Sequence, residues 1–147
     1  MKITKFNYNP NEADAIAELE FKNGFPAVIH ACYPDELYPQ ENFDHEKNKR
    51  DIFDHACTLG SWLEANLDNI YEYIASRFLQ LKNDIIPMEE EMTKEEFLSE
   101  ICLGLTYATL DGTTYIYLTT GDLFHGNLIV VNFDENLEIT DAEILRD

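Results

Sequence analysis

Hydrophobic and polar residues alternate in the N-terminal part of the chain, which predicts β-strands there. Residues 2–8 and 14–21 both show this period of two, although a short helix is an alternative for the second segment. Residues 26–33 form an apolar run that is typical of a buried strand. The pair Asn23-Gly24 lies just before this run and is a strong turn signal, so we expect a β-hairpin. The polar residues 34–50 then predict a loop.

The middle of the chain changes to a helical pattern. Between residues 53 and 85 the apolar positions recur in steps of three and four, as on one face of an α-helix. Gly60 interrupts this run, and the following Ser61-Trp62-Leu63-Glu64 fits a capping box, so one long helix and two helices in line are both open. Pro87 is expected to end the helix. A second capping box, Thr93-Lys94-Glu95-Glu96, predicts a short helix that continues to about Ile101.

The period returns to two from Leu103 onward. Residues 103–109, 113–119 and 127–133 predict three strands with short connections. The pair Asp111-Gly112 fits a type I′ turn, because glycine readily adopts positive φ. Residues 137–144 predict a last edge strand or a short helix.

These elements predict a single α+β domain over residues 1–147. In it, a mostly antiparallel sheet packs against one long helix, or two in line, and a short capped helix. The chain has 147 residues, 45% of them hydrophobic, which is enough for a hydrophobic core. It shows no signal-peptide pattern, no stretch of about 20 apolar residues and no close cysteine pair. We therefore expect a cytoplasmic protein with no membrane partner.

The formal net charge is −19, and its distribution is uneven. The segment from Glu95 to Leu145 contains ten acidic residues and no lysine or arginine, whereas Lys47, Lys49 and Arg50 gather basic charge in one short run. Such a charge argues against nucleic acid as a partner. The acidic surface either keeps the protein soluble, mimics nucleic acid or docks a basic protein.

Two groups of residues offer candidate chemistry. In the loop from Thr120 to Gly126, Asp122 and His125 could act as an acid–base pair or as half of a metal site. The alternative is that Asp122 accepts hydrogen bonds from loop amides while His125 is only exposed, and the lack of a third partner favours it.

Asp51 and His55 form the second group, one helical turn apart, and Asp44 could supply a third ligand to a divalent cation. The alternative is an acidic helix start that interacts favourably with the helix dipole. No established metal-binding motif accompanies these residues, which favours that alternative.

Several motifs after Asn66 carry a resemblance. They are Leu79–Asp84, Thr93–Phe97, Gly121-Asp122-Leu123-Phe124, Gly126, Ile129-Val130-Val131 and Asp141-Ala142-Glu143-Ile144. With them the chain resembles a bacterial domain-of-unknown-function family whose members end in a pattern close to D-G-D-L-F-W-G-H-x-I-x-V. His125-Gly126-Asn127 stands where that pattern has aromatic-Gly-His, and Thr120 replaces its acidic residue. The resemblance supports the fold and implies no established activity.

The sequence favours a non-enzymatic, immunity-type or other binding module that docks a basic protein partner and has no cofactor. Its binding residues are expected in the loop and on the acidic face, namely Asp122, Phe124, His125, Asn127, Asp134 and Glu135. The alternative is a metal-dependent hydrolase that uses Asp51 with His55, or Asp122 with His125. A third alternative is an accessory domain that forms a homodimer through a sheet edge, so monomer and homodimer are both open.

Overall fold

Seven strands and two helices make up the computed structural model, which describes residues 1–34, 42–85 and 91–146. The helices are α1 (His45–Ile85) and α2 (Lys94–Ser99). The strands are β1 (Lys2–Asn9), β2 (Asp14–Glu20), β3 (Pro26–Cys32), β4 (Cys102–Thr109), β5 (Thr114–Thr119), β6 (Ile129–Phe133) and β7 (Ile139–Ile144). These bounds confirm the predicted strands, and residues 139–144 form a strand rather than a helix.

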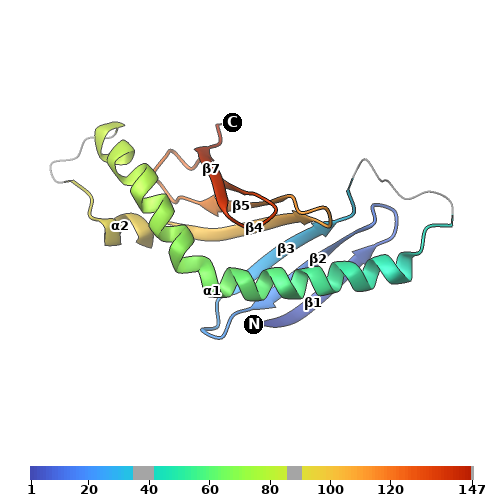
Figure 1. Ribbon diagram of the computed structural model, residues 1–147. Helices are drawn as coiled ribbons and strands as arrows, with labels where there is room; N and C mark the ends of the chain where they lie inside the picture. Colours follow the sequence, from blue (N-terminus) through green and yellow to red (C-terminus); the bar gives the residue numbers. More distant parts are fainter. Residues whose placement is uncertain (35–41, 86–90, 147) are drawn as a thin grey trace.

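All seven strands belong to one sheet, in the order β1-β2-β3-β4-β5-β6-β7 (Figure 1). Every neighbouring pair is antiparallel except β3 and β4, which are parallel. Parallel neighbours need a long crossover connection, and the segment that holds α1 and α2 provides it. The predicted α+β class with a mostly antiparallel sheet is confirmed. Neither helix in the described residues has a stretch apolar enough to cross a bilayer.

The first hairpin forms as predicted around Asn23-Gly24. Gly24 has a φ of +88°, and the amide of Phe21 donates to the carbonyl of Phe25 at 2.9 Å to close the turn. Alternate residues of β2 are buried under α1, whereas Ile16, Glu18 and Glu20 point to the opposite side of the sheet.

Helix α1 is a single helix of 41 residues, so a division at Gly60 is ruled out. The predicted capping box at Ser61 is also wrong, because Ser61 lies in the helix interior. Glu64 instead accepts hydrogen bonds from the backbone amide of Lys22 at 2.6 Å and from the Met1 ammonium group at 3.1 Å. A side chain at position 60 would place its Cβ 2.8 Å from Leu19 Cδ1, so glycine lets the helix lie close to the sheet.

The predicted polar loop over residues 34–50 is wrong in its second half, because α1 already begins at His45. Asp44 caps this start: its Oδ1 accepts a hydrogen bond from the amide of Lys47 at 3.0 Å. The polar composition of residues 45–50 is typical of a loop, but most of these residues occupy exposed positions of the helix, where charged side chains are tolerated. Residues 35–41 and the predicted helix end at Pro87 lie outside the described residues.

Helix α1 bends near its middle, so that its two halves lie over different parts of the sheet (Figure 1). The Asn66 side chain donates to the Trp62 carbonyl at 2.8 Å, and the Gly60-Ser61 pair lies one turn earlier. Both features favour bending, because one competes for a helical carbonyl and the other is flexible. The bend allows Trp62 to pack edge-on against Phe133 of β6 at 5.4 Å and Phe78 to pack near Phe124.

The predicted cap of α2 is confirmed. The Thr93 side chain accepts from the Glu96 amide at 3.2 Å, and the Glu96 carboxylate accepts from the Thr93 amide at 3.3 Å. The helix ends at Ser99, two residues before the predicted end, and buries Phe97 completely.

The turn between β4 and β5 is not the predicted type I′ turn. That turn needs positive φ at both central residues, and only Gly112 has it, at +103°. The Gly112 amide donates to the Thr109 carbonyl at 3.2 Å, and the Thr109 amide donates to the Thr113 carbonyl at 2.9 Å. This is a three-residue loop with glycine in the left-handed position.

Candidate functional site

The two sides of the sheet differ, and the side opposite α1 is the candidate functional surface. Its side chains alternate with the buried ones along each strand and lie outside the hydrophobic core. We call it the open face. Its central residues, from β3 to β6, are Val28, His30, Leu105, Tyr107, Tyr115, Tyr117, Val130 and Asn132.

A row of aromatic rings runs across the open face. His30 meets Tyr107 edge-on at 5.5 Å, Tyr107 stacks on Tyr115 at 4.7 Å, and Tyr115 meets Tyr117 edge-on at 5.4 Å. All four residues are half-buried. Burial raises the pKa of Tyr115 to about 12. Such side chains combine a large apolar area with a polar tip, as residues at protein interfaces often do.

Acidic side chains border this row on the edge strand β7. Asp141 pairs with Asn132 and Glu143 pairs with Val130, so both exposed carboxylates lie on the open face. Among the described residues, none of the ten acidic side chains between positions 95 and 145 forms an ion pair. At the opposite edge the pattern differs, since Glu18 and Glu20 lie directly across from Lys5 and Lys2.

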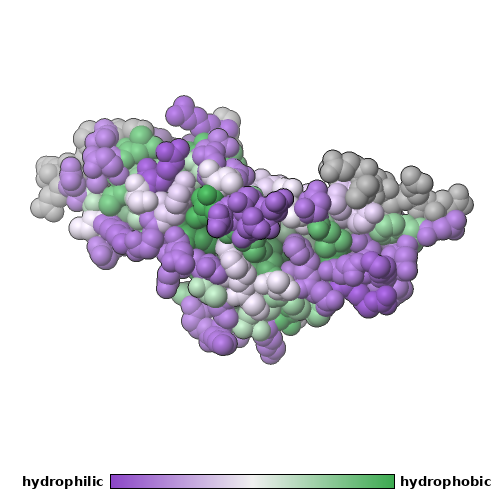
Figure 2. Space-filling model, viewed as in Figure 1, coloured by the Kyte–Doolittle hydropathy of each residue, from purple (hydrophilic) through white to green (hydrophobic). Residues whose placement is uncertain are grey.

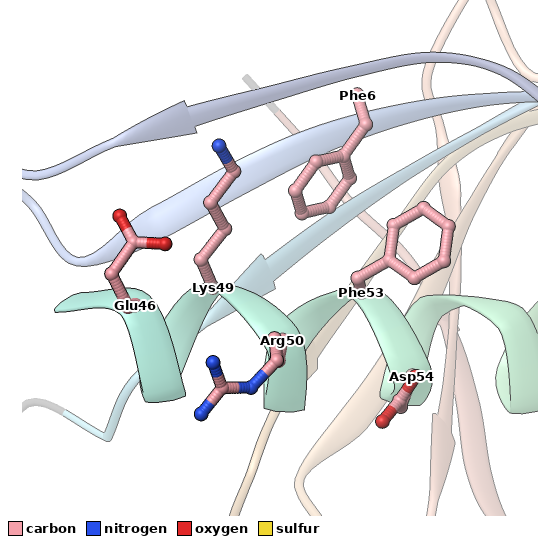
Figure 3. Close-up of a pocket in the computed structure, with 6 residues that line it drawn as sticks. All are labelled: Phe6, Glu46, Lys49, Arg50, Phe53 and Asp54. Atoms are coloured by element: carbon pink, nitrogen blue, oxygen red, sulfur yellow. The ribbon is translucent and has the colours of Figure 1, made fainter. Parts of the chain in front are cut away.

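The helix side of the molecule has a different surface. Figure 2 shows that its hydrophobic residues appear as separate patches between hydrophilic ones. A hollow of about 510 Å³ lies between β1 and the start of α1. Phe6 and Phe53 meet edge-on at its base, at 5.2 Å, and Lys49 extends beside them while Arg50 and Asp54 point away (Figure 3). Glu46 and Lys49, which carry opposite charges, both line it, so its charges indicate no particular ligand.

One group of potential metal ligands lies on the open face, and sequence reasoning missed it. Asp14 of β2 and His30 and Cys32 of β3 place their ligand atoms within 4.8 Å of one another. His30 Nε2 lies 2.7 Å from Asp14 Oδ2 and 3.5 Å from Cys32 Sγ, and Cys32 is in no disulfide. A signal existed in the sequence: residues 30 and 32 share one side of a strand, and a hairpin centred on residue 23 pairs residue 14 with residue 32.

The residues predicted as a metal site on α1 are not brought together. Asp44 caps the helix, and Asp51 Oδ2 forms an ion pair with Lys47 Nζ at 2.7 Å. The His55 ring is half-buried, and burial lowers its pKa below the usual value. Within the described part of the chain, the group of Asp14, His30 and Cys32 is the one set of three such ligands.

The predicted loop site divides into exposed and buried residues. Asp122 and His125 are exposed, whereas Phe124 is only 5% exposed and packs near Phe97 in the core. Gly121, His125 and Gly126 all have positive φ, and the Thr120 hydroxyl donates to the Asn127 carbonyl at 2.6 Å. These contacts hold the loop in a tight shape, and Phe124 is one of its anchors.

The last two predicted binding residues lie in the turn between β6 and β7. The Asp134 carboxylate accepts hydrogen bonds from the amides of Asn136 at 2.8 Å and Glu138 at 3.0 Å, so Asp134 shapes the turn. Glu135 is exposed beside Gly112 of the neighbouring turn.

Fold and surface together define an acidic α+β protein with one helix-covered and one open sheet face. The chain belongs to a family of uncharacterised proteins conserved in bacteria, DUF2262, whose model matches residues 36–144. The resemblance to a bacterial family without established activity is thereby confirmed, and the match begins well before Asn66. No curated protein and no solved structure matches the chain. The match includes the three open-face tyrosines and β7, whereas Asp14, His30 and Cys32 precede it.

Proposed function

We propose that this protein is a non-enzymatic binding module that docks a basic protein on the open face and the adjoining β7 edge. An immunity-type inhibitor of a cationic toxin is the concrete form of this proposal. The observation that carries it is the set of acidic side chains on β7, without ion-pair partners among the described residues, beside a row of half-buried tyrosines.

The two features have complementary physical effects. Asp141 and Glu143 would attract a basic partner over a distance of about one Debye length and speed its association, an effect that salt weakens. Once in contact, Tyr107, Tyr115 and Tyr117 would bury apolar area and offer their ring faces to arginine or lysine side chains. Acidic residues on an edge strand also disfavour pairing with a second copy, which supports a monomer over a homodimer.

The hydrolase alternative receives no support from the described residues. Asp51 is already paired with Lys47, and the exposed Asp122 and His125 belong to no group of three metal ligands among the described residues.

A differential capture experiment tests the proposal. The wild-type protein and two double variants are immobilised, and a lysate of the host cells is applied at low and at high salt. Asp141→Asn with Glu143→Gln removes two charges from the β7 edge. Glu18→Gln with Glu20→Gln removes the same charge from the same face, where lysines lie opposite.

We expect the wild type and the Glu18/Glu20 variant to retain the same basic protein at low salt. High salt should release this protein, and the Asp141/Glu143 variant should not retain it. With that protein purified, Tyr117→Ala should weaken binding by at least tenfold, as for a central interface residue. Equal retention on both double variants, or a retained protein that is not basic, contradicts the proposal.

A further inference from the structure

We propose that Asp14, His30 and Cys32 bind one zinc ion on the N-terminal part of the open face. This site goes beyond the docking function: its three ligands lie on β2 and β3, towards the β1 edge of the open face, whereas the proposed docking residues lie on β4, β5 and β7.

The positions of the three side chains follow from the hairpin. His30 and Cys32 are two residues apart on β3, so they point to the same side, and Asp14 is the direct cross-strand neighbour of Cys32. Both strands are internal to the sheet, with β1 and β4 as their outer neighbours. A site on internal strands is held more rigidly than one on loops.

The distances between the ligand atoms are close to those of a tetrahedral zinc site. With zinc–nitrogen and zinc–oxygen bonds of about 2.05 Å and zinc–sulfur bonds of about 2.3 Å, neighbouring ligands lie about 3.3 Å apart for N and O and about 3.6 Å for N and S. The His30 Nε2 to Cys32 Sγ distance of 3.5 Å already fits. The Nε2 to Asp14 Oδ2 distance of 2.7 Å needs to open by about 0.6 Å, which small rotations of the two side chains provide.

The ligand types select the metal. Imidazole and thiolate favour zinc over magnesium and calcium, which prefer oxygen ligands. Three protein ligands also leave one coordination position for water or for another ligand. The side chains of His30 and Asp14 are 26% and 20% exposed, so an ion can reach the group from solvent.

Zinc binding changes the protonation of His30 and Cys32. Zinc takes the lone pair of His30 Nε2, so the hydrogen that Nε2 donates to Asp14 must leave that atom. In the neutral ring it is lost to solvent while Nδ1 gains one from solvent, so the ring has no net proton change. The Cys32 thiol releases one proton to solvent as it becomes thiolate. The hydrogen bond between His30 and Asp14 is replaced by two bonds to the metal. The edge of Tyr107 against the His30 ring, at 5.5 Å, helps to keep the imidazole in place.

Zinc titration of the untagged, reduced full-length chain against a competing chelator tests this site. We expect one zinc per chain, and we expect cobalt in its place to give the thiolate charge-transfer band and the strong visible bands of a tetrahedral site. His30→Gln and Cys32→Ser should each weaken zinc binding by about 100-fold or more, because even residues that only support ligands contribute about 10–100-fold. Zinc should raise the melting temperature of the wild type and leave that of both variants unchanged.

Matched controls are available in the same chain. His125→Gln and Cys102→Ser remove an exposed histidine and an exposed cysteine outside the group, and both should bind zinc as the wild type does. If Cys32→Ser fails to fold, Asp14→Asn replaces it, since asparagine can still accept the His30 hydrogen bond but is a poor zinc ligand. Wild-type protein without zinc affinity, without the cobalt–thiolate band, or with affinity that these substitutions leave unchanged overturns the proposal.

Discussion

At the residue scale, Gly60 shows how a single contact can outweigh local preference. Glycine is a poor helix former, yet α1 runs through position 60 without a break. The reason lies across the interface, where Leu19 is only 2% exposed and its Cδ1 occupies the space that a Cβ would need. The helix therefore gains close packing on β2 at the cost of some helix propensity.

We expect Gly60→Ala to lower the free energy of unfolding by up to about 2 kcal/mol. Overpacking costs about 1–3 kcal/mol, whereas the better helix former returns about 1 kcal/mol. Chemical denaturation measures the change. Ser61→Ala, at an exposed neighbouring position, should change stability little. In a Leu19→Ala background the clash is removed, and Gly60→Ala should then stabilise the protein; stabilisation in the wild-type background as well would contradict the contact.

At the scale of elements, the start of α1 depends on a small set of polar contacts. Asp44 caps the helix, and the Asn48 side chain donates to Tyr8 Oη at 2.9 Å and to the Ala13 carbonyl at 3.3 Å. Tyr8 Oη also lies within hydrogen-bond distance of His45 Nδ1, at 2.7 Å. These bonds attach the first turn of α1 to β1 and to the turn before β2.

Two substitutions of Asp44 test whether this residue acts as a helix cap or as a metal ligand. Asp44→Ala should lower the free energy of unfolding by about 1 kcal/mol, whereas Asp44→Asn should retain most of the stability because asparagine caps helices as well as aspartate does. Thermal and chemical unfolding measure both variants, and zinc affinity should be the same in all three proteins. Equal losses in the two variants would show that charge, rather than the hydrogen bond, matters at this position.

At the scale of the whole molecule, the net charge of −19 acts on stability as well as on binding. Only three ion pairs that do not involve a histidine form among the described residues, so most acidic groups repel one another without compensation. Repulsion between exposed charges is screened once their separation exceeds the Debye length.

The melting temperature should therefore rise by several degrees when sodium chloride increases from about 10 mM to about 150 mM, which shortens the Debye length from about 30 Å to about 8 Å. Differential scanning calorimetry at constant pH checks this. The Asp141/Glu143 double variant should show a smaller rise, because it carries two fewer charges. A melting temperature that is constant or falls with salt would show that attractive pairs dominate the surface.

Much of the fold was predictable because its signals are local. The alternation in β2 and β5, the turn at Asn23-Gly24 and the cap at Thr93 each depend on residues close together in the chain. The start of α1 was missed because its exposed first turns look like a polar loop, and the type I′ turn was wrong because Asp111-Gly112 fits more than one loop length.

The residues of the candidate site were harder to predict from the sequence than the fold. Phe124, for example, was predicted as a binding residue of an exposed loop, but it is buried.

By itself, the sequence indicated most of the strands, the central helical region, the short capped helix, the mostly antiparallel α+β class and the strong negative charge, since periodicity and composition are properties of short segments. Only the tertiary structure decided that β3 pairs in parallel with β4, that Gly60 lies inside one helix and that both helices of the described residues lie over the same face of the sheet. It also decided that Asp14 meets His30 and Cys32. These features depend on which distant segments pack together, and that choice is made by the burial of the whole core.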